Sequence, residues 1–222
     1  MAVKPATNNA PYSTAIIKRT VTFQTEEAKG FLGNRLAGIA VALFTLDVIS
    51  RKRIARLNMS TKDHKAASKA LNKLLTDFET SLNDESARLQ AILKSQKITS
   101  LAAHNNPGTE EVEITTPELK RVLEILMQFD KLIILVDTVW LEGFMETDVA
   151  NKFRVQKNAQ LKRLFGSIYK LSQAAKQSAF VKDDVDTQAA IAREEEKLGV
   201  TEENDNQPTQ ATSVVTEEQA VA

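Results

Sequence analysis

Residues 15–28 read A-I-I-K-R-T-V-T-F-Q-T-E-E-A, and the rest of the chain is arranged around the change of period within them. In residues 15–24, apolar side chains alternate with polar ones: Ile17, Val21 and Phe23 against Lys18, Thr20 and Thr22. This alternation predicts a β-strand with one apolar and one polar face. Thr25 and the two acidic residues after it are typical of a helix N-cap and first turn. A strand therefore leads directly into a helix.

The predicted strand needs a partner, because unpaired backbone groups and an apolar face would otherwise meet water. Two partners fit the sequence equally well. One is the same strand of a second chain, which would make a two-stranded ribbon across a two-fold axis. The other is an intramolecular sheet with residues 97–101 or 111–114. The ribbon would present its polar face twice, and a ribbon of this shape fits the major groove of DNA.

The candidate DNA-binding residues lie on this strand and in a basic run further along the chain. Arg19 lies between Lys18 and Thr20 in the sequence, so its side chain would be on the other face of the strand, near the end of the ribbon. The basic run is typical of a solvated helix face as well as of a rim that contacts phosphate. The full set is Lys18, Arg19, Thr20, Thr22, Arg51, Lys52 and Arg53.

Charge is distributed unevenly along the 222 residues, although the net charge is zero. Residues 183–222 hold eleven acidic and two basic residues, which leaves a net charge of +9 on residues 1–182. We therefore expect three parts: a flexible arm at 1–13, a basic helical body at 14–182, and an acidic, largely disordered tail at 183–222. The body suits a polyanionic partner, and the tail either competes for the same surface or aids solubility.

The middle of the chain predicts helices separated by clear breaks. Gly33-Asn34 marks a break between two helices, and the glycines around it lack the spacing of a nucleotide-binding loop. Residues 39–49 form a buried helix, because the uncharged stretch is too short to span a membrane. A long amphipathic helix follows from Thr61 to about Lys94. Residues 95–116 form a loop with a short hairpin between 98–101 and 112–114.

Two strong helices complete the body. Thr116-Pro117-Glu118 is a clear start signal for a central core helix that ends at Gly143. Its Asp130 and Asp137 are expected to cap or to form salt bridges rather than to act as paired catalytic carboxylates. The last helix runs from Glu146 to about Gln177. Its apolar residues face inward: Val149, Phe153, Leu161, Leu164, Phe165, Ile168 and Leu171. Its other face is basic: Lys152, Arg154, Lys157, Lys162, Arg163, Lys170 and Lys176.

Enzyme chemistry has little support in the sequence. Without cysteine there is no thiolate nucleophile and no Cys-ligated metal. His64 and His104 are the only histidines, and neither belongs to a catalytic motif. We expect no catalytic site, no metal and no cofactor. The N-terminus has no signal peptide pattern, so we expect a cytoplasmic protein.

Residues 116–153, T-P-E-L-K-R-V-L-E-I-L-M-Q-F-D-K-L-I-I-L-V-D-T-V-W-L-E-G-F-M-E-T-D-V-A-N-K-F, with K-R-L-F-G-S-I-Y at 162–169, carry a family resemblance. They resemble the C-terminal half of a family from conjugative plasmids and integrating conjugative elements, which includes the AcaB-type transcriptional activators of plasmid transfer genes. Residues 24–33, Q-T-E-E-A-K-G-F-L-G, resemble its N-terminal motif. The resemblance implies DNA binding through a ribbon-helix-helix element and activation of conjugation genes.

The sequence thus predicts a mainly α protein: a helical bundle with an N-terminal β-strand, ribbon-helix-helix-like, and a dimer through the strand. Its predicted function is sequence-specific DNA binding as an activator of conjugative transfer genes. Expected partners are double-stranded DNA and a second copy, with RNA polymerase or another activator as a further candidate, and no membrane. The alternative is a helical structural or interaction protein of a conjugative element, whose basic face binds an acidic partner.

Overall fold

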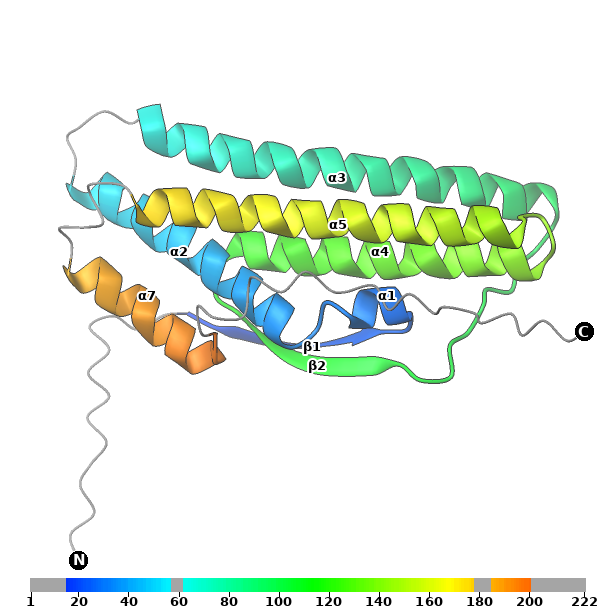
Figure 1. Ribbon diagram of the computed structural model, residues 1–222, viewed down its shortest axis with the longest axis horizontal. Helices are drawn as coiled ribbons and strands as arrows, with labels where there is room; N and C mark the ends of the chain where they lie inside the picture. Colours follow the sequence, from blue (N-terminus) through cyan, green and yellow to red (C-terminus); the bar gives the residue numbers. More distant parts are fainter. Residues whose placement is uncertain (1–14, 57–61, 178–184, 201–222) are drawn as a thin grey trace, which may run out of the picture.

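The computed structural model describes residues 15–56, 62–177 and 185–200. Three long helices lie side by side: α3 (Lys62–Ser95), α4 (Pro117–Leu141) and α5 (Thr147–Lys176) (Figure 1). The remaining elements lie along the side of α4 and α5 away from α3: β1 (Ile17–Phe23), α1 (Glu26–Lys29), α2 (Asn34–Arg56), β2 (Gly108–Ile114) and α7 (Val185–Leu198). The predicted mainly helical fold with an N-terminal strand is confirmed.

The partner of β1 is β2 of the same chain. The two strands are antiparallel, with Ile17 opposite Ile114 and Phe23 opposite Gly108. Of the two pairings that fit the sequence, the intramolecular one with residues 111–114 is therefore present, extended back to Gly108. Pairing with 97–101 is wrong, and so is the hairpin between 98–101 and 112–114.

The physical reason lies in which side chains can be buried together. Val112 and Ile114 of β2 are buried on the same side of the sheet as Val21 and Phe23 of β1. In residues 98–101, by contrast, Leu101 is 57% exposed. Pairing that segment with β2 would therefore bury much less apolar surface than pairing β1 with it.

The predicted helix boundaries follow from local hydrogen bonds. The Thr25 hydroxyl accepts the N–H of Ala28, which caps α1. α1 ends at Lys29 with Gly30 as its C-cap, and Gly33, with a left-handed φ of 67°, turns the chain so that α2 begins at Asn34. The predicted break is confirmed. At α4, the Thr116 hydroxyl accepts the N–H of Leu119 at 3.2 Å, ahead of Pro117.

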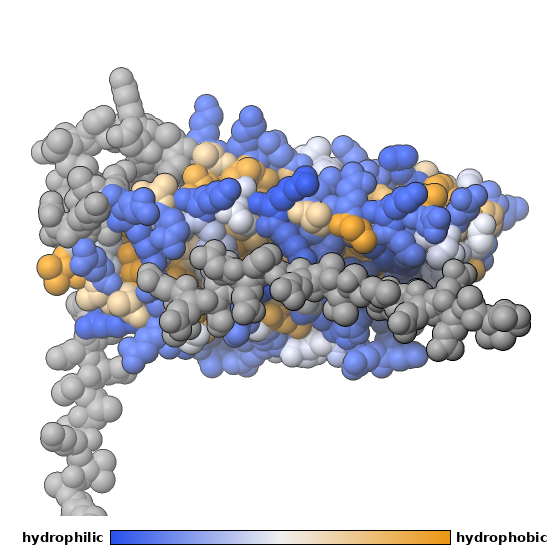
Figure 2. Space-filling view, in the orientation of Figure 1, coloured by the Kyte–Doolittle hydropathy of each residue, from blue (hydrophilic) through white to orange (hydrophobic). Residues whose placement is uncertain are grey.

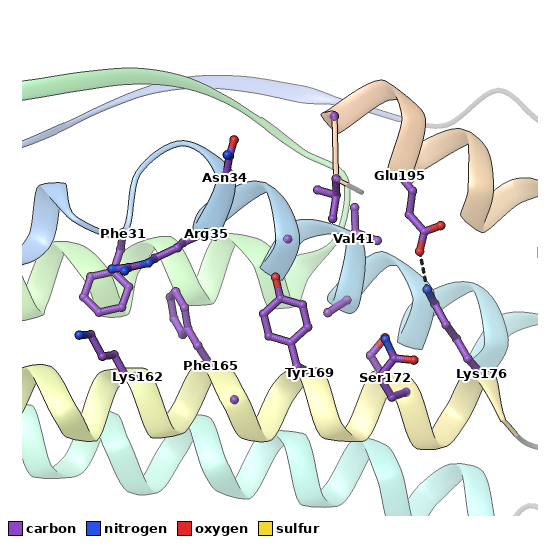
Figure 3. A pocket seen from close by; sticks show the side chains of 16 residues that line it. Phe31, Asn34, Arg35, Val41, Lys162, Phe165, Tyr169, Ser172, Lys176 and Glu195 are labelled. Carbon is purple, nitrogen blue, oxygen red and sulfur yellow. Dashed lines mark hydrogen bonds and ion pairs between the residues drawn. The ribbon is translucent and has the colours of Figure 1, made fainter. Parts of the chain in front are cut away.

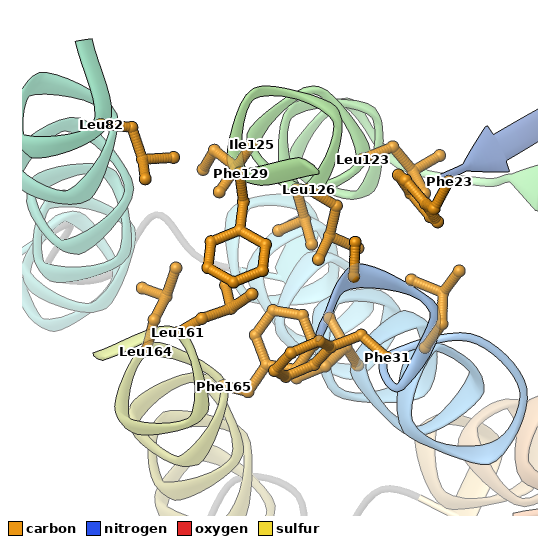
Figure 4. Packing of buried hydrophobic residues seen from close by; sticks show 14 of the residues in the cluster. Phe23, Phe31, Leu82, Leu123, Ile125, Leu126, Phe129, Leu161, Leu164 and Phe165 are labelled. Carbon is orange, nitrogen blue, oxygen red and sulfur yellow. The ribbon is translucent and has the colours of Figure 1, made fainter. Parts of the chain in front are cut away.

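The core is formed around α4. Phe31 of the α1–α2 turn makes edge-to-face contacts with Phe129 of α4 and Phe165 of α5, with ring centroids 6.3 and 5.2 Å apart (Figure 4). All three rings are buried. Truncating one of them to alanine would cost about 3 to 5 kcal/mol, because the cavity left behind cannot collapse fully. One inward assignment on α5 is wrong, since Val149 is 50% exposed while Ala150 is fully buried.

The two aspartates of α4 are both structural, as predicted. Asp130 is buried and accepts hydrogen bonds from the backbone N–H groups of Gln24 and Thr25. Asp137 forms an ion pair with Arg154 of α5. The first contact ties the β1–α1 junction to the core helix, and the second ties α5 to α4. Neither arrangement brings the two carboxylates together.

Helix α7 lies within the stretch that the sequence assigned to the acidic tail, 183–222. Its Ile191 is buried against Ile49 of α2, and Thr187 is fully buried. Glu195 forms an ion pair with Lys176 of α5, and Lys197 forms one with Glu113 of β2. The first part of the acidic stretch is therefore packed on the body. In the described ranges, no helix combines the length and apolar character that crossing a bilayer requires.

Candidate nucleic-acid interface

The polar face of the two-stranded sheet brings together three of the predicted site residues. Lys18, Thr20 and Thr22 of β1 lie opposite Glu113, Glu111 and Thr109 of β2. The Lys18 ammonium lies 3.2 Å from Glu111 Oε1 and 3.5 Å from Glu113 Oε1. Hydrogen bonding to Glu111 holds the pKa of Lys18 above its ordinary value. This face therefore carries carboxylates as well as a cation.

Lys197 of α7 supplies a second cation at the edge of this face. Its hydrogen bond to Glu113 is the main cause of the lowered pKa of that carboxyl group, with a smaller contribution from Lys18. Glu113 thus stays ionised between two ammonium groups. At neutral pH the sheet face has two cations and two carboxylates. Sequence reasoning found Lys18 but missed the two glutamates, because they come from a strand whose register it did not predict.

The first half of β1 is open to solvent on both of its faces. Residues 15–20 are all exposed, and they include Ile16 at 44%, Ile17 at 64% and Arg19. Within the described parts of the chain, the β1 backbone bonds to β2 along one edge and has no strand along the other. Arg19 lies on the opposite side of the sheet from Lys18, as its parity predicts. An open strand edge is a template for pairing with another chain.

The basic run after the buried helix lies on the last part of α2, away from the sheet. Arg51 is exposed and donates from Nε to the Asp47 carboxylate at 2.9 Å, one helical turn earlier. Such an exposed pair is weak and leaves the guanidinium accessible to a phosphate. Lys52 and Arg53 belong to the same helix, but their side chains lie outside the described residues.

Six of the seven basic residues of α5 divide into two groups, and the seventh, Lys162, lines a cavity. Arg154, Lys157 and Lys176 make contacts within the fold. Arg154 pairs with Asp137, and Lys176 pairs with Glu195. Lys157 is 4% exposed and donates to Ser81 at 3.2 Å, with Glu85 at 3.7 Å. These cations stabilise helix packing and are not available to a partner.

The second group forms a stripe on the outer side of α5, which we call the α5 stripe: Lys152, Arg163 and Lys170. Their spacings of eleven and seven residues are close to three and two helical turns, so they share one face. All three are exposed, and none has a carboxylate partner among the residues that the structure describes. Figure 2 shows hydrophilic side chains over much of the α3 and α5 surface. The stripe spans about 27 Å at 1.5 Å per residue.

A cavity of about 680 Å³ opens between α2, α5 and the end of α7. Figure 3 shows Arg35 and Lys162 at one end of it and the Lys176–Glu195 ion pair at the other, with Tyr169 between them. Gly38 of α2 permits this arrangement, because a Cβ there would lie 1.6 Å from the Tyr169 hydroxyl. Phe31 and Phe165 form an aromatic wall beside Arg35. No sequence motif pointed to this cavity.

His104 is the only histidine whose side chain is described. Its Nε2 lies 3.1 Å from Asp137 Oδ2, close enough for an ion pair, although the approach angle does not form a hydrogen bond. That carboxylate is already held by Arg154. Within the described ranges, no three His, Asp or Glu side chains converge in a way that would bind a metal ion. His64 has no described side chain.

The architecture defined by these elements is a helical bundle with a two-stranded antiparallel sheet against its side. The crystal structure of selenomethionine-containing AcaB from uropathogenic E. coli has the same fold, with a TM-score of 0.70 at 20% sequence identity. The match covers 84% of this chain and 100% of the AcaB chain. No protein-family model and no curated protein sequence matches the chain. The likeness to AcaB predicted from the sequence is thus confirmed at the level of the fold.

Proposed function

We propose that this chain is a DNA-binding regulator of conjugative transfer genes, which acts as an activator in the cytoplasm. The observation that carries the proposal is the α5 stripe, whose exposed cations have no carboxylate partner in the described parts of the chain. Cations held on one rigid helix suit a row of phosphates. The fold shared with AcaB supports the same function by analogy.

The open edge of β1 supports a dimer. Two copies of β1 pairing across a two-fold axis would produce a four-stranded sheet with β1 strands at its centre and β2 strands outside. Ile16 and Ile17, which are largely exposed in the single chain, would then be covered. Burying such side chains is favourable by about 25 cal/mol per Å² of apolar surface.

Such a sheet would place the two copies of Lys18, Thr20 and Thr22 in the middle of its polar face. The glutamates of β2 would lie one strand further out, about 4.8 Å away. Lys18 would need to exchange Glu111 for a base edge. This exchange costs little, because an exposed ion pair contributes only about 0 to 1 kcal/mol. The proposed reading residues are therefore Lys18, Thr20 and Thr22.

The other proposed contacts position the protein on the DNA without reading bases. Arg19 lies near the end of β1, and Arg51, Lys52 and Arg53 lie in the last part of α2. Their proposed role is to bind phosphate, and the α5 stripe has the same proposed role. RNA polymerase or another activator is a further proposed partner.

A gel-shift series at fixed salt tests this proposal, using DNA from upstream of the chain's own operon and a random duplex of equal length. Lys18→Ala and Thr20→Ala should each weaken cognate binding by about 1 to 3 kcal/mol and change random binding much less. Arg163→Ala with Lys170→Ala, two residues of the α5 stripe, should weaken binding to both duplexes if these residues touch phosphate. The deciding quantity is the ratio of cognate to random binding affinity. If the β1 variants keep the ratio of the unmodified chain and the α5 variant lowers it, α5 and not β1 reads the bases.

A second candidate function is an interaction protein whose α5 stripe binds an acidic protein. Glu111 and Glu113 favour it, because carboxylates on the sheet face oppose close approach to phosphate. The same gel-shift series separates the two functions. Absence of any binding to either duplex at low salt would favour the interaction protein.

A further inference from the structure

The cavity between α2, α5 and α7 lies where the described part of the chain ends. Gly199 and Val200, which follow α7, both line it. Gly199 has a φ of 64°, and the N–H groups of Gly199 and Val200 bond back to the carbonyls of Glu196 and Glu195. This is the hydrogen-bond pattern of a Schellman cap, which stops the helix and turns the chain. The described chain therefore ends at the wall of the cavity.

The far end of the cavity carries cations without carboxylate partners. Arg35 donates to the carbonyl of Gly30 at 2.8 Å and lies over the Phe31 ring, 5.8 Å from its centroid. Lys162 projects beside it from α5 (Figure 3). Neither forms an ion pair with an Asp or Glu of residues 15–56, 62–177 or 185–200. Lys176, at the other end, is already paired with Glu195.

The chain that follows Val200 has the complementary charge. Residues 201–206 read T-E-E-N-D-N, and the remaining residues to 222 add Glu217 and Glu218 without any basic residue. The segment also begins with polar residues that can hydrogen-bond to Asn34 and Gln173, which line the cavity. The negative charge of the segment and its attachment to Val200 both make it the best candidate to occupy the cavity.

We propose that residues 201–206 of this chain occupy the cavity, with the carboxylates of Glu202, Glu203 and Asp205 paired with Arg35 and Lys162. Lys162 and Lys176 are fourteen residues apart in α5, about 21 Å of helix. Glu203 and Asp205 lie three and five residues past Val200, about 10 and 17 Å of extended chain, so their carboxylates can lie along most of this length of the cavity. The covalent tether keeps the local concentration of the segment in the millimolar range, so even weak pairing fills the site.

The absence of cysteine allows a direct test in the full-length chain. The test variant combines Gly166→Cys with Asn206→Cys. Gly166 lines the cavity, and a Cβ at this position meets no atom within 4 Å. The control combines Ala189→Cys with Asn206→Cys. Ala189 is exposed on α7, eleven residues before Val200, or about 16 Å of helix, so the segment can reach it equally well.

Rates of intramolecular disulfide formation under mild oxidation are measured by mass spectrometry at low protein concentration. The cavity pair should close about tenfold faster than the control pair at low salt. This advantage should disappear at high salt, and when Glu202→Gln, Glu203→Gln and Asp205→Asn are added. Equal rates for both pairs at low salt would overturn the proposal, and so would an advantage that survives removal of the three charges. The experiment uses no DNA, so its result does not depend on whether the proposed DNA-binding function is correct.

Discussion

The carboxylate of Asp130 holds Thr25 by two hydrogen bonds, one from its backbone N–H at 2.9 Å and one from its hydroxyl at 2.7 Å. The neighbouring N–H of Gln24 donates to the same carboxylate at 3.0 Å. Asp130 is 5% exposed, so water cannot replace these bonds. The end of β1 and the start of α1 are thereby fixed to the central helix, which positions the sheet face beside the bundle.

Replacing Asp130 with alanine should therefore destabilise the protein. Three donors would lose their acceptor, and two of them are buried. We expect the free energy of unfolding to fall by about 2 to 4 kcal/mol, and by less for Asp130→Asn, which keeps one acceptor oxygen. Urea denaturation measures both. Asp84→Ala, an exposed site on α3, is the control, and a value for Asp130→Ala equal to this control would contradict the assignment.

A charge on the open edge of β1 should prevent the proposed dimer. Ile17→Lys replaces an apolar side chain, on the part of β1 that the second copy would cover, with a charged one, and charged side chains on an edge strand oppose pairing. The side chain is 64% exposed in the single chain, so the fold should be unaffected. Light scattering at micromolar concentration should show a dimer for the unmodified chain and a monomer for the variant. Leu101→Lys, at a 57% exposed loop position, should remain dimeric. A monomeric unmodified chain would rule out the dimer.

Removing the α5 stripe should weaken DNA binding in a salt-dependent way. If each of Lys152, Arg163 and Lys170 displaces one counterion, their triple alanine variant should reduce the slope of log K against log salt by about 2.7, or 0.9 per phosphate contact. Titrations of a random duplex at several salt concentrations measure the slope. Arg88→Ala provides a matched control, because this exposed cation already pairs with Glu85. Identical slopes for the triple variant and the unmodified chain would exclude the stripe from the interface.

Glu194 of α7 should make stability depend on pH. Burial raises the pKa of this carboxyl group above its ordinary value of 4.5, Lys197 opposes the rise and Glu113 adds to it. A raised folded pKa means that the native state binds more protons, so stability falls as pH rises through the folded pKa. Glu194→Gln should therefore stabilise the protein by a few tenths of a kcal/mol at pH 7, because half-exposed charges are screened.

Thermal melts of Glu194→Gln and of the unmodified chain at pH 4 and pH 7 measure this gain in stability. The gain should be present at pH 7 and small at pH 4, where Glu194 is mostly protonated in both the folded and the unfolded chain. Glu196→Gln, at an exposed site on the same helix, is the control for the loss of one carboxylate. A gain of equal size at both pH values would show that packing, and not ionisation, is responsible.

The elements that could be predicted from the sequence are those specified by neighbouring residues. Thr116-Pro117 starts α4 because a hydroxyl cap and a ring-fixed φ act within one turn. Gly33, in the turn between α1 and α2, has a left-handed φ that glycine adopts readily. β1 was recognisable from its own alternation. The roles of Asp130 and Asp137 as structural groups followed from the absence of a motif partner.

The features that could not be predicted depend on residues far apart in the chain. β2 reads G-T-E-E-V-E-I, with three glutamates in seven residues; its second half, 111–114, was one of the partners that fit the sequence, but only the pairing with β1 extends it to Gly108 and sets its register. The carboxylates opposite Lys18 were missed for the same reason. α7 carried a weak signal, since Thr187, Ile191 and Leu198 recur at helical spacing within an acidic stretch. The cavity needs three separate helices and has no local signature.

The pairing of β1 with β2 also sets an order of events during synthesis. Lys18 meets Glu111, which lies 93 residues later in the chain. At 5 to 20 residues per second, a ribosome takes roughly 5 to 20 seconds to supply that second strand. During this interval β1 has left the ribosomal exit tunnel with both edges unpaired. Unpaired strand edges can form hydrogen bonds with other chains. Lys18 and Arg19, on opposite faces of its first half, give nascent copies a mutual repulsion, which the glutamates of β2 reduce at Lys18 when they arrive.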